Sequence, residues 1–302
     1  MIKRPALRLT LDHARQFAAY GAAAGRIREF AERWSRYRNL PLPRVAIRTI
    51  QSPRQHVGLG LGTQLGLGVA TLLNCAVSSD QASTQVLAAS VGRGARSAVG
   101  CYGFRQGGFI AERGVEKPGR LSPLETRVEF PQDWTFLLAF QAKRSGIFGS
   151  AENSAFRQLP PVPASVTAQL KRILYDEMSP ALRNHDFERF SDSLFRYGEI
   201  AGNCFVKVQG GAYLNRLSQQ TVDALQAFGV RGVGQSSWGP TIFAVCQDCR
   251  QAEAAADYLR GHFAAEELEF EISAADNHGA SLLADAQCEW LDAIENSGVA
   301  SP

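Results

Sequence analysis

The sequence predicts an α+β fold in which a layer of helices covers a mostly antiparallel sheet. Amphipathic helical segments and short apolar strands follow one another along the chain, and glycine-rich loops join such elements at two distant places. The proline cluster Pro160-Pro-Val-Pro163 divides the chain into residues 1–160 and residues 161–302. At 302 residues the chain is long enough for two domains.

In the first part, residues 25–38 have apolar side chains at helical spacing, and the helix ends before Leu40-Pro-Leu-Pro43. Residues 44–50 alternate in the manner of a strand, and an apolar run predicts a helix over residues 63–78. The other elements expected here are a helix that begins within residues 82–90 and strands at residues 109–111 and 135–140.

In the second part, residues 164–203 are expected to be mostly helical, with apolar and aromatic stripes that belong to the core. A helix over residues 219–228 ends at Gly229, a residue type that often follows the last helical turn, and Val230 opens a strand. The last expected elements are a strand at residues 242–245, a helix at residues 251–264 and a short strand at residues 270–272.

Composition narrows the class of protein. A net charge of +3 is too small to indicate nucleic acid or a membrane surface as a partner. The six cysteines are scattered, and the pair Cys246–Cys249 has no second pair with which to bind zinc. Residues 1–15 contain no apolar signal-peptide core, and no run of about 18 apolar residues indicates a membrane span. We therefore expect a cytoplasmic protein with reduced thiols.

The first glycine-rich loop, Val57-Gly-Leu-Gly-Leu-Gly62, lies between a predicted strand and a predicted helix. Glycines let backbone N–H groups approach a ligand, and a helix N-terminus offers unpaired donors and partial positive charge. The loop therefore predicts a phosphate or pyrophosphate cradle; a tight turn without a ligand is the alternative. No Gly-Lys-Ser/Thr follows and the spacing is not Gly-x-Gly-x-x-Gly, so neither a Walker A loop nor a dinucleotide fold is expected.

A second glycine element, Gly232-Val-Gly-Gln-Ser-Ser-Trp-Gly-Pro-Thr241, precedes a later strand. Together the two elements resemble the ATP-loop motif and the C-terminal glycine motif of the GHMP kinase superfamily. The residues within the two elements resemble one branch of this superfamily, the β-ribofuranosylaminobenzene 5′-phosphate synthases. The first element reads His56-Val-Gly-Leu-Gly-Leu-Gly-Thr-Gln-Leu65. Segments 92–100, 103–110, 208–211 and 275–280 support the resemblance.

The resemblance implies a two-layer α+β sandwich, with an N-terminal part like ribosomal protein S5 and a ferredoxin-like C-terminal part. It also implies a transferase that condenses phosphoribosyl pyrophosphate with 4-aminobenzoate or 4-hydroxybenzoate. The acceptor's ring carbon attacks C1 of the ribose, CO₂ and pyrophosphate leave, and the product is a C-riboside 5′-phosphate for tetrahydromethanopterin biosynthesis. Mg²⁺ is the implied cofactor, because a pyrophosphate leaving group needs its charge neutralised. The expected partners are these small molecules, and a homodimer is expected from the family.

The chain departs from the superfamily at three places. Kinase relatives carry a catalytic Asp where this chain has Gly94–Gly103, a run without any acid, and this favours a decarboxylating transferase over an ATP-dependent small-molecule kinase. Leu61 stands where a small Ser is typical, so one phosphate contact is expected to be missing. The chain begins at what would be the second element of the family, Pro5–Leu11, and is expected to lack the first strand. A truncated, non-catalytic relative therefore stays an open alternative.

The candidate site residues come from the two glycine elements and the segments between them. Gln64, Arg96 and Gln235 are candidates for catalytic roles, and Glu152 is the candidate Mg²⁺ ligand. The residues expected to bind phosphate or other parts of the substrates are His56, Gly58, Gly60, Gly62, Thr63, Arg93, Gly234, Ser236, Ser237, Asp276 and Asn277. The two glycine loops are predicted to form opposite walls of one cleft.

Each candidate also has a plainly structural interpretation. Arg93 and Arg96 are expected to clamp a phosphate or carboxylate, or to be solubilising surface residues. Trp238 stacks on the acceptor ring or belongs to the core. Gln64 is otherwise part of a helix N-cap, His56 is structural and Glu152 is a surface residue. The first glycine element is otherwise a tight turn, the second is a loop that serves packing alone, and Asp276 and Asn277 form a turn.

Overall fold

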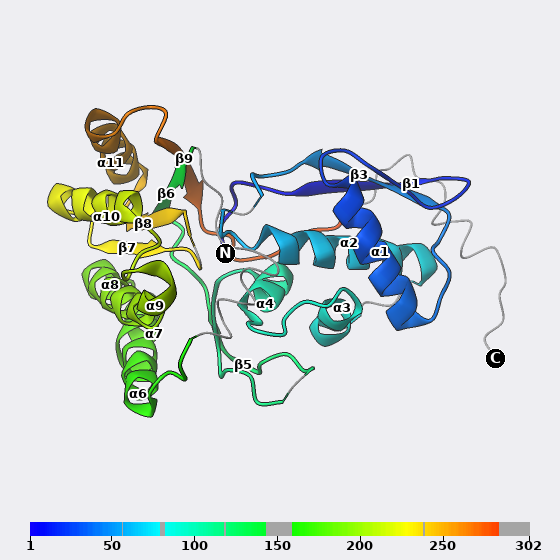
Figure 1. The fold of residues 1–302 in the computed structure, drawn as a ribbon, viewed down its shortest axis with the longest axis horizontal. Coiled ribbons are helices and arrows are strands. Elements are labelled where there is room, and N and C mark those ends of the chain that lie inside the picture. Colours follow the sequence, from blue (N-terminus) through cyan, green and yellow to red (C-terminus); the bar gives the residue numbers. More distant parts are fainter. Residues whose placement is uncertain (56, 79–81, 118, 143–158, 238, 284–302) are drawn as a thin grey trace.

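The computed structural model describes the whole chain except His56, residues 79–81, Pro118, residues 143–158, Trp238 and residues 284–302. Two parts lie side by side in Figure 1: helices α1 to α4 with a small sheet, and helices α6 to α11 with a larger sheet. No helix in this described part of the chain is both long enough and apolar enough to cross a membrane.

The N-terminal part is built on a three-stranded sheet. Its strands are β1 (Arg8–His13), β2 (Ala18–Tyr20) and β3 (Val45–Gln51). The central strand, β3, runs antiparallel to β1 and parallel to β2. Helices α1 (Ala24–Arg38) and α2 (Leu61–Val77) pack beneath this sheet (Figure 1).

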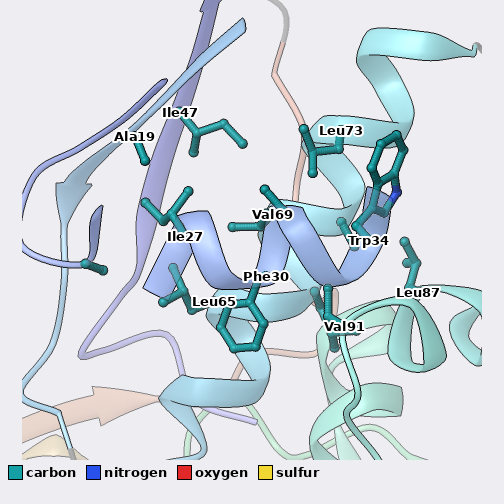
Figure 2. Close-up of a cluster of buried hydrophobic side chains, with 14 of the residues drawn as sticks. Ala19, Ile27, Phe30, Trp34, Ile47, Leu65, Val69, Leu73, Leu87 and Val91 are labelled. Carbon is teal, nitrogen blue, oxygen red and sulfur yellow. The ribbon is translucent and has the colours of Figure 1, made fainter. Parts of the chain in front are cut away.

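The core between α1, α2 and the sheet fixes how the two helices meet. Figure 2 shows Phe30 and Trp34 of α1 among apolar side chains of α2 and β3, and both are almost fully buried. The Trp34 indole donates a hydrogen bond to Asn74 near the end of α2 (3.2 Å). Phe30 packs against Gly66 one to two turns after the start of α2, where a Cβ would lie 3.2 Å from the ring. Phe30 therefore contacts the early part of α2, and Trp34 contacts its later part.

Two short helices and a hairpin complete this part. Helix α3 (Thr84–Ser90) leads through a loop to α4 (Val99–Gln106). Strands β4 (Phe109–Glu112) and β5 (Leu124–Val128) then form an antiparallel hairpin.

The C-terminal part contains a four-stranded antiparallel sheet with the order β7-β8-β6-β9. Its strands are β6 (Thr135–Gln141), β7 (Gly232–Gln235), β8 (Ile242–Cys246) and β9 (Leu268–Ala274). Strand β6 comes before residue 160 in the chain, so this sheet takes strands from both sides of the predicted domain boundary. The boundary between 1–160 and 161–302 itself stays a prediction.

Helices pack on both faces of this sheet. Helices α10 (Arg216–Phe228) and α11 (Cys249–His262) cover the face that carries Ala244. The opposite face, which carries Val245, packs against the aromatic cluster around Phe190. The helices on that side are α6 (Ala164–Arg172), the π-helix η1 (Ile173–Met178), α7 (Ser179–Arg183), α8 (Phe187–Asn203) and α9 (Val206–Gln209).

The predicted elements are present, with shifts at their ends. The helix predicted over residues 219–228 ends at Gly229, whose backbone is left-handed as expected. Strands β2 and β5 and helix α4 were not predicted as elements, whereas β1 overlaps the segment Pro5–Leu11 that the resemblance marks as an element. Helix α4 contains Gly100 and Gly103, a residue type that weakens helices and hides their periodicity.

Candidate functional site

The two glycine loops touch each other, although 178 residues separate their contacting members. The Ser236 hydroxyl donates a hydrogen bond to the Gly58 carbonyl (2.9 Å), and the Thr241 hydroxyl donates to the Val57 carbonyl (2.6 Å). A Cβ on Gly58 would fall on the Ser236 carbonyl and lie 2.9 Å from the Gly239 carbonyl. The convergence expected from the sequence is therefore observed, and only glycine fits at the point of contact.

The first loop presents backbone donors. Gly58 and Gly60 have left-handed backbones (φ +88° and +69°), and Gly60 is the residue that precedes α2. No hydrogen bond between described residues uses the N–H groups of Gly58, Leu59 or Gly60. The Thr63 N–H instead donates to the Gly60 carbonyl (2.9 Å). The unused donors thus lie in the loop, and the N–H of Thr63, which was predicted to bind phosphate, is used within the structure.

Two arginines converge on the first turn of α2. A Cβ on Gly62 would lie 2.7 Å from a terminal nitrogen of Arg26 and 3.4 Å from one of Arg93. Burial lowers the pKa of both guanidinium groups, and the neighbouring charges of Arg26, Arg33 and Arg96 lower the pKa of Arg93 further. The Nε atom of Arg93 is buried without a hydrogen-bond partner. Positive charge is concentrated here beside a helix N-terminus, the arrangement that favours an anion.

Arg93 was predicted from the sequence, but Arg26 was not. Arg26 is one of several arginines in the amphipathic helix α1, and nothing in its spacing distinguishes it. Its place in the site follows only from how α1 packs against α2.

A carboxylate lies at the start of α4. Glu112 of β4 accepts a hydrogen bond from the Ala98 N–H (2.6 Å). Burial first, and the Glu112 charge second, raise the pKa of the nearby Cys101 thiol to about 11. The segment Gly94–Gly103 holds no acid, as its sequence says, yet the fold supplies one from the following strand. The sequence argument against a kinase is weaker for that reason.

The Gln235 side chain braces the second loop. The Gln235 amide accepts a hydrogen bond from the Leu214 N–H (2.7 Å) and donates one to the Ser237 carbonyl (3.2 Å). Gly234 faces the Phe243 ring, which a Cβ would approach to 2.8 Å. Ser237 has a left-handed backbone (φ +53°), an uncommon conformation for a residue other than glycine. The hydrogen bonds of Gln235 therefore help to hold the shape of this loop.

Solved structures of similar fold support this architecture. The homoserine kinase from Cytophaga hutchinsonii has a TM-score of 0.61 at 12% identity, over 92% of this chain and 89% of that one. The mevalonate diphosphate decarboxylase from Enterococcus faecalis has a TM-score of 0.61 at 16% identity, over 89% and 84%. The family described as GHMP kinases C terminal matches residues 178–265. These likenesses confirm the predicted GHMP-type α+β fold.

Two proteins named β-ribofuranosylphenol 5′-phosphate synthase are also similar in sequence. The one from Methanothermobacter thermautotrophicus is 30% identical over 205 residues, which cover 64% of this chain and 61% of that protein. The one from Archaeoglobus fulgidus is 29% identical over 241 residues, which cover 75% and 72%. The chain is thus similar in sequence to proteins named β-ribofuranosylphenol 5′-phosphate synthase. Because it spans 61% of the length of the first relative, the activity and substrates of that protein are proposals for this chain.

Gln64 lies where the first turn of α2 approaches α4. Its side-chain amide donates a hydrogen bond to the Gly100 carbonyl (3.0 Å), and a Cβ on Gly100 would lie 3.4 Å from the Thr63 side chain. Gln64 therefore links α2 to α4 and does not cap its own helix. Its predicted contact with a substrate stays a prediction.

Asp276 and Asn277 lie at the other end of α4. The Asn277 amide makes hydrogen bonds with the Phe130 N–H (2.9 Å) and carbonyl (2.8 Å), and a Cβ on Gly107 would meet the Asn277 backbone at 2.5 Å. The Asp276 carboxylate accepts from the N–H groups of the following turn. Helix α4 has eight residues, or about 12 Å, between this turn and the Gly100 contact. The structure thus places these two residues in a turn, at the end of α4 opposite the Gly100 contact.

The remaining candidates are located only in part. Arg96 lies close enough to Arg93 for its charge to lower the Arg93 pKa. His56, Glu152 and Trp238 lie outside the described residues. Among the residues that are described, no group of three His, Cys, Asp or Glu side chains could hold a metal ion.

Proposed function

We propose that this chain transfers the ribosyl 5-phosphate unit of phosphoribosyl pyrophosphate to a ring carbon of 4-hydroxybenzoate or 4-aminobenzoate. The contact between the two glycine loops carries the proposal, because it creates one donor-rich site from two segments that the resemblance assigns to a single substrate. The names of the relatives describe a phenol riboside, the product that 4-hydroxybenzoate would give after losing CO₂. We therefore favour 4-hydroxybenzoate as the acceptor and tetrahydromethanopterin biosynthesis as the pathway.

The proposed reaction balances without a general base. The bond from C1 of the ribose to pyrophosphate breaks, and the ring carbon that bears the carboxylate forms the new bond to C1. The carbon–carboxylate bond then breaks, CO₂ leaves and its electron pair restores the aromatic ring. The negative charge that develops is on the pyrophosphate. We propose that this charge is stabilised by the N–H groups of Gly58, Gly60 and Gly62 and by the guanidinium of Arg93, which lies beside Gly62.

Mg²⁺ belongs to the proposal only as an ion carried by the pyrophosphate oxygens. Mg²⁺ commonly binds through substrate phosphates, water and one or two carboxylates. The described residues supply no ready group of such ligands, so we assign no step to a metal. A cytoplasmic location and a homodimer likewise stay predictions.

An ATP-dependent small-molecule kinase is the second candidate. The observation that favours it is the Glu112 carboxylate at the start of α4, next to the segment where kinase relatives carry their acid. A kinase needs such a group near the hydroxyl that receives the phosphoryl group.

Two reaction mixtures separate the candidates. One contains phosphoribosyl pyrophosphate, 4-hydroxybenzoate and Mg²⁺; the other contains ATP, Mg²⁺ and a panel of small alcohols. The proposal expects equal amounts of CO₂ and pyrophosphate in the first mixture and no ADP in the second. ADP formation with an alcohol would replace the proposal by the kinase. Binding of phosphoribosyl pyrophosphate without turnover of any acceptor would support the non-catalytic relative.

A further inference from the structure

Arg26 stands at the first turn of α2 because of the packing of α1. Along the two helices, Arg26 lies beside Gly62, Phe30 beside Gly66 and Trp34 beside Asn74. The two aromatic residues are almost fully buried and fix this order of contacts (Figure 2). The packing of α1 against α2 in the N-terminal core therefore positions the Arg26 guanidinium beside the start of α2.

Three arginines near Phe30, which are Arg26, Arg33 and Arg93, differ in their partners. Arg33 is paired with Glu29 (2.5 Å). Within the described structure, neither Arg26 nor Arg93 forms an ion pair; Arg26 donates only to the neutral amide of Gln55 (3.2 Å). Arg93 is stacked on the Phe30 ring, 5.0 Å from its centre. Two half-buried positive charges thus lie together, and the acidic neighbour that acts on both, Glu29, is already paired with Arg33.

Such a pair costs stability unless an anion occupies it. Burying a charge without a partner is unfavourable, and two like charges repel. Guanidinium forks match phosphate oxygens and can bind them in bidentate fashion. Both forks approach the same point on Gly62, on the turn whose free N–H groups also favour an anion.

We infer that Arg26 and Arg93 form a two-guanidinium seat that binds the pyrophosphate group of the donor at the first turn of α2. The identity of this anion rests on the proposed function; the anion seat itself does not. Arg26 is then a binding residue contributed by α1, a helix that no motif connects to the site. A doubly charged phosphoryl group suits two guanidiniums better than the single charge of the acceptor carboxylate.

The test is titration calorimetry with inorganic pyrophosphate on the full chain, without any acceptor. Arg26→Gln is expected to weaken binding roughly 10- to 100-fold, because it removes a charged hydrogen-bond donor. Arg36→Gln is the matched control: Arg36 lies on the same helix, but it is exposed and donates a hydrogen bond to the Glu32 carbonyl. It is expected to leave pyrophosphate binding unchanged. Arg26→Lys, which keeps the charge but not the fork, should fall between.

A second measurement separates a binding role from a structural one. In the absence of ligand, Arg26→Gln should melt at the same temperature as the parent chain or higher, because it removes an unpaired charge. Pyrophosphate should raise the melting temperature of the parent chain more than that of the variant. A lower melting temperature in Arg26→Gln together with unchanged pyrophosphate affinity in Arg26→Lys would overturn the inference, as would a parent chain that does not bind pyrophosphate.

Further titrations identify the anion and separate this inference from the proposed function. Ribose 5-phosphate and 4-hydroxybenzoate should bind Arg26→Gln as they bind the parent chain. If the loss falls on either of those ligands instead, the assignment to pyrophosphate is wrong. If the parent chain binds pyrophosphate through Arg26 but turns over no benzoate, the proposed function fails and the anion seat stands. If turnover is normal in Arg26→Gln, the proposed function stands and the seat fails.

Discussion

Gly58 and Gly60 have similar backbones but different surroundings. Both are left-handed, which strains any residue with a side chain. A Cβ on Gly58 would collide with the Ser236 and Gly239 carbonyls, whereas a Cβ on Gly60 would meet nothing within 4 Å. The two positions therefore separate the cost of the backbone conformation from the cost of pushing the loops apart.

We predict that Gly58→Ala is more harmful than Gly60→Ala. Gly60→Ala should lower the free energy of unfolding by about 1–2 kcal/mol through backbone strain alone. Gly58→Ala should lose about 1–3 kcal/mol more from overpacking, and should also weaken pyrophosphate binding. Urea unfolding of both variants, with Gly198→Ala in the open middle of α8 as the control, measures the difference. Equal losses would mean that the loop contact carries no energy.

Two buried thiols make the fold sensitive to alkali. Burial is the main cause that raises the pKa of Cys246 to about 12 and that of Cys101 to about 11, from an ordinary value of 9.0. In the unfolded chain these thiols lose their protons at lower pH than in the folded chain. The unfolded state then binds fewer protons, so the free energy of unfolding falls as pH rises above the ordinary value.

Removing one of these thiols should flatten that dependence. We predict that Cys246→Ala loses less stability than the parent chain between about pH 8 and about pH 10, by up to about 1.4 kcal/mol for each pH unit above the unfolded pKa. Urea unfolding at several pH values checks it. Cys249→Ala removes an exposed thiol whose pKa is raised less, mainly by a hydrogen bond with Glu253, and should change the slope less than Cys246→Ala. If the free energy of unfolding of Cys246→Ala fell with pH as steeply as that of the parent chain, groups other than Cys246 would determine the loss of stability in alkali.

At the scale of elements, two hydroxyl groups connect the loop after β7 to the loop before α2. Thr241 is fully buried, and its bond to the Val57 carbonyl lies inside the contact. Thr221 is equally buried, but its hydroxyl bonds to the Leu217 carbonyl within α10 (2.8 Å). The same substitution at the two positions therefore tests a bond between elements against a bond within one.

We predict that Thr241→Val lowers the free energy of unfolding by about 1–3 kcal/mol, because it leaves a buried carbonyl without its donor. It should also weaken pyrophosphate binding, since the first loop loses one of its supports. Thr221→Val should leave the binding unchanged. Calorimetric titration of both variants decides, and equal affinities for pyrophosphate in both would contradict the role given to the contact between the loops.

The sequence allowed much of the fold to be predicted because its strongest signals are local. The amphipathic period of α1 and α10 and the glycine that ends α10 are read directly from neighbouring residues. Helix α4 was missed because its glycines serve close contacts with other segments, not the helix itself. A Cβ on Gly103 would collide with the Met1 sulfur, and a Cβ on Gly107, the residue after the helix, would meet the Asn277 backbone.

The site was predictable only where a motif encodes it. The glycine loops carry their own signature, whereas Arg26 and Glu112 enter the site through tertiary packing alone. In the same way, the polar pair Asp276 and Asn277 looked like substrate ligands, yet their hydrogen bonds form a turn and hold Phe130. Single-residue patterns do not reveal which polar groups the folded chain uses internally.

At the scale of the molecule, the two parts are joined by more than the glycine loops. The chain leaves the N-terminal part through β6, which lies in the middle of the C-terminal sheet. Ile2 pairs with Ala275, the residue that follows the last residue of β9. Three separate segments thus hold the parts together, and the contact between the loops sits on a supported interface.

A crystal structure of the chain with phosphoribosyl pyrophosphate tests the central claim most directly. The account predicts the pyrophosphate at the first turn of α2, within hydrogen-bond distance of the N–H groups of Gly60 and Gly62 and of Arg26 and Arg93, with the loop around Ser236 as the opposite wall. Phosphates bound elsewhere, such as beside Asp276, or a ligand that touches only one of the two glycine loops, would contradict it.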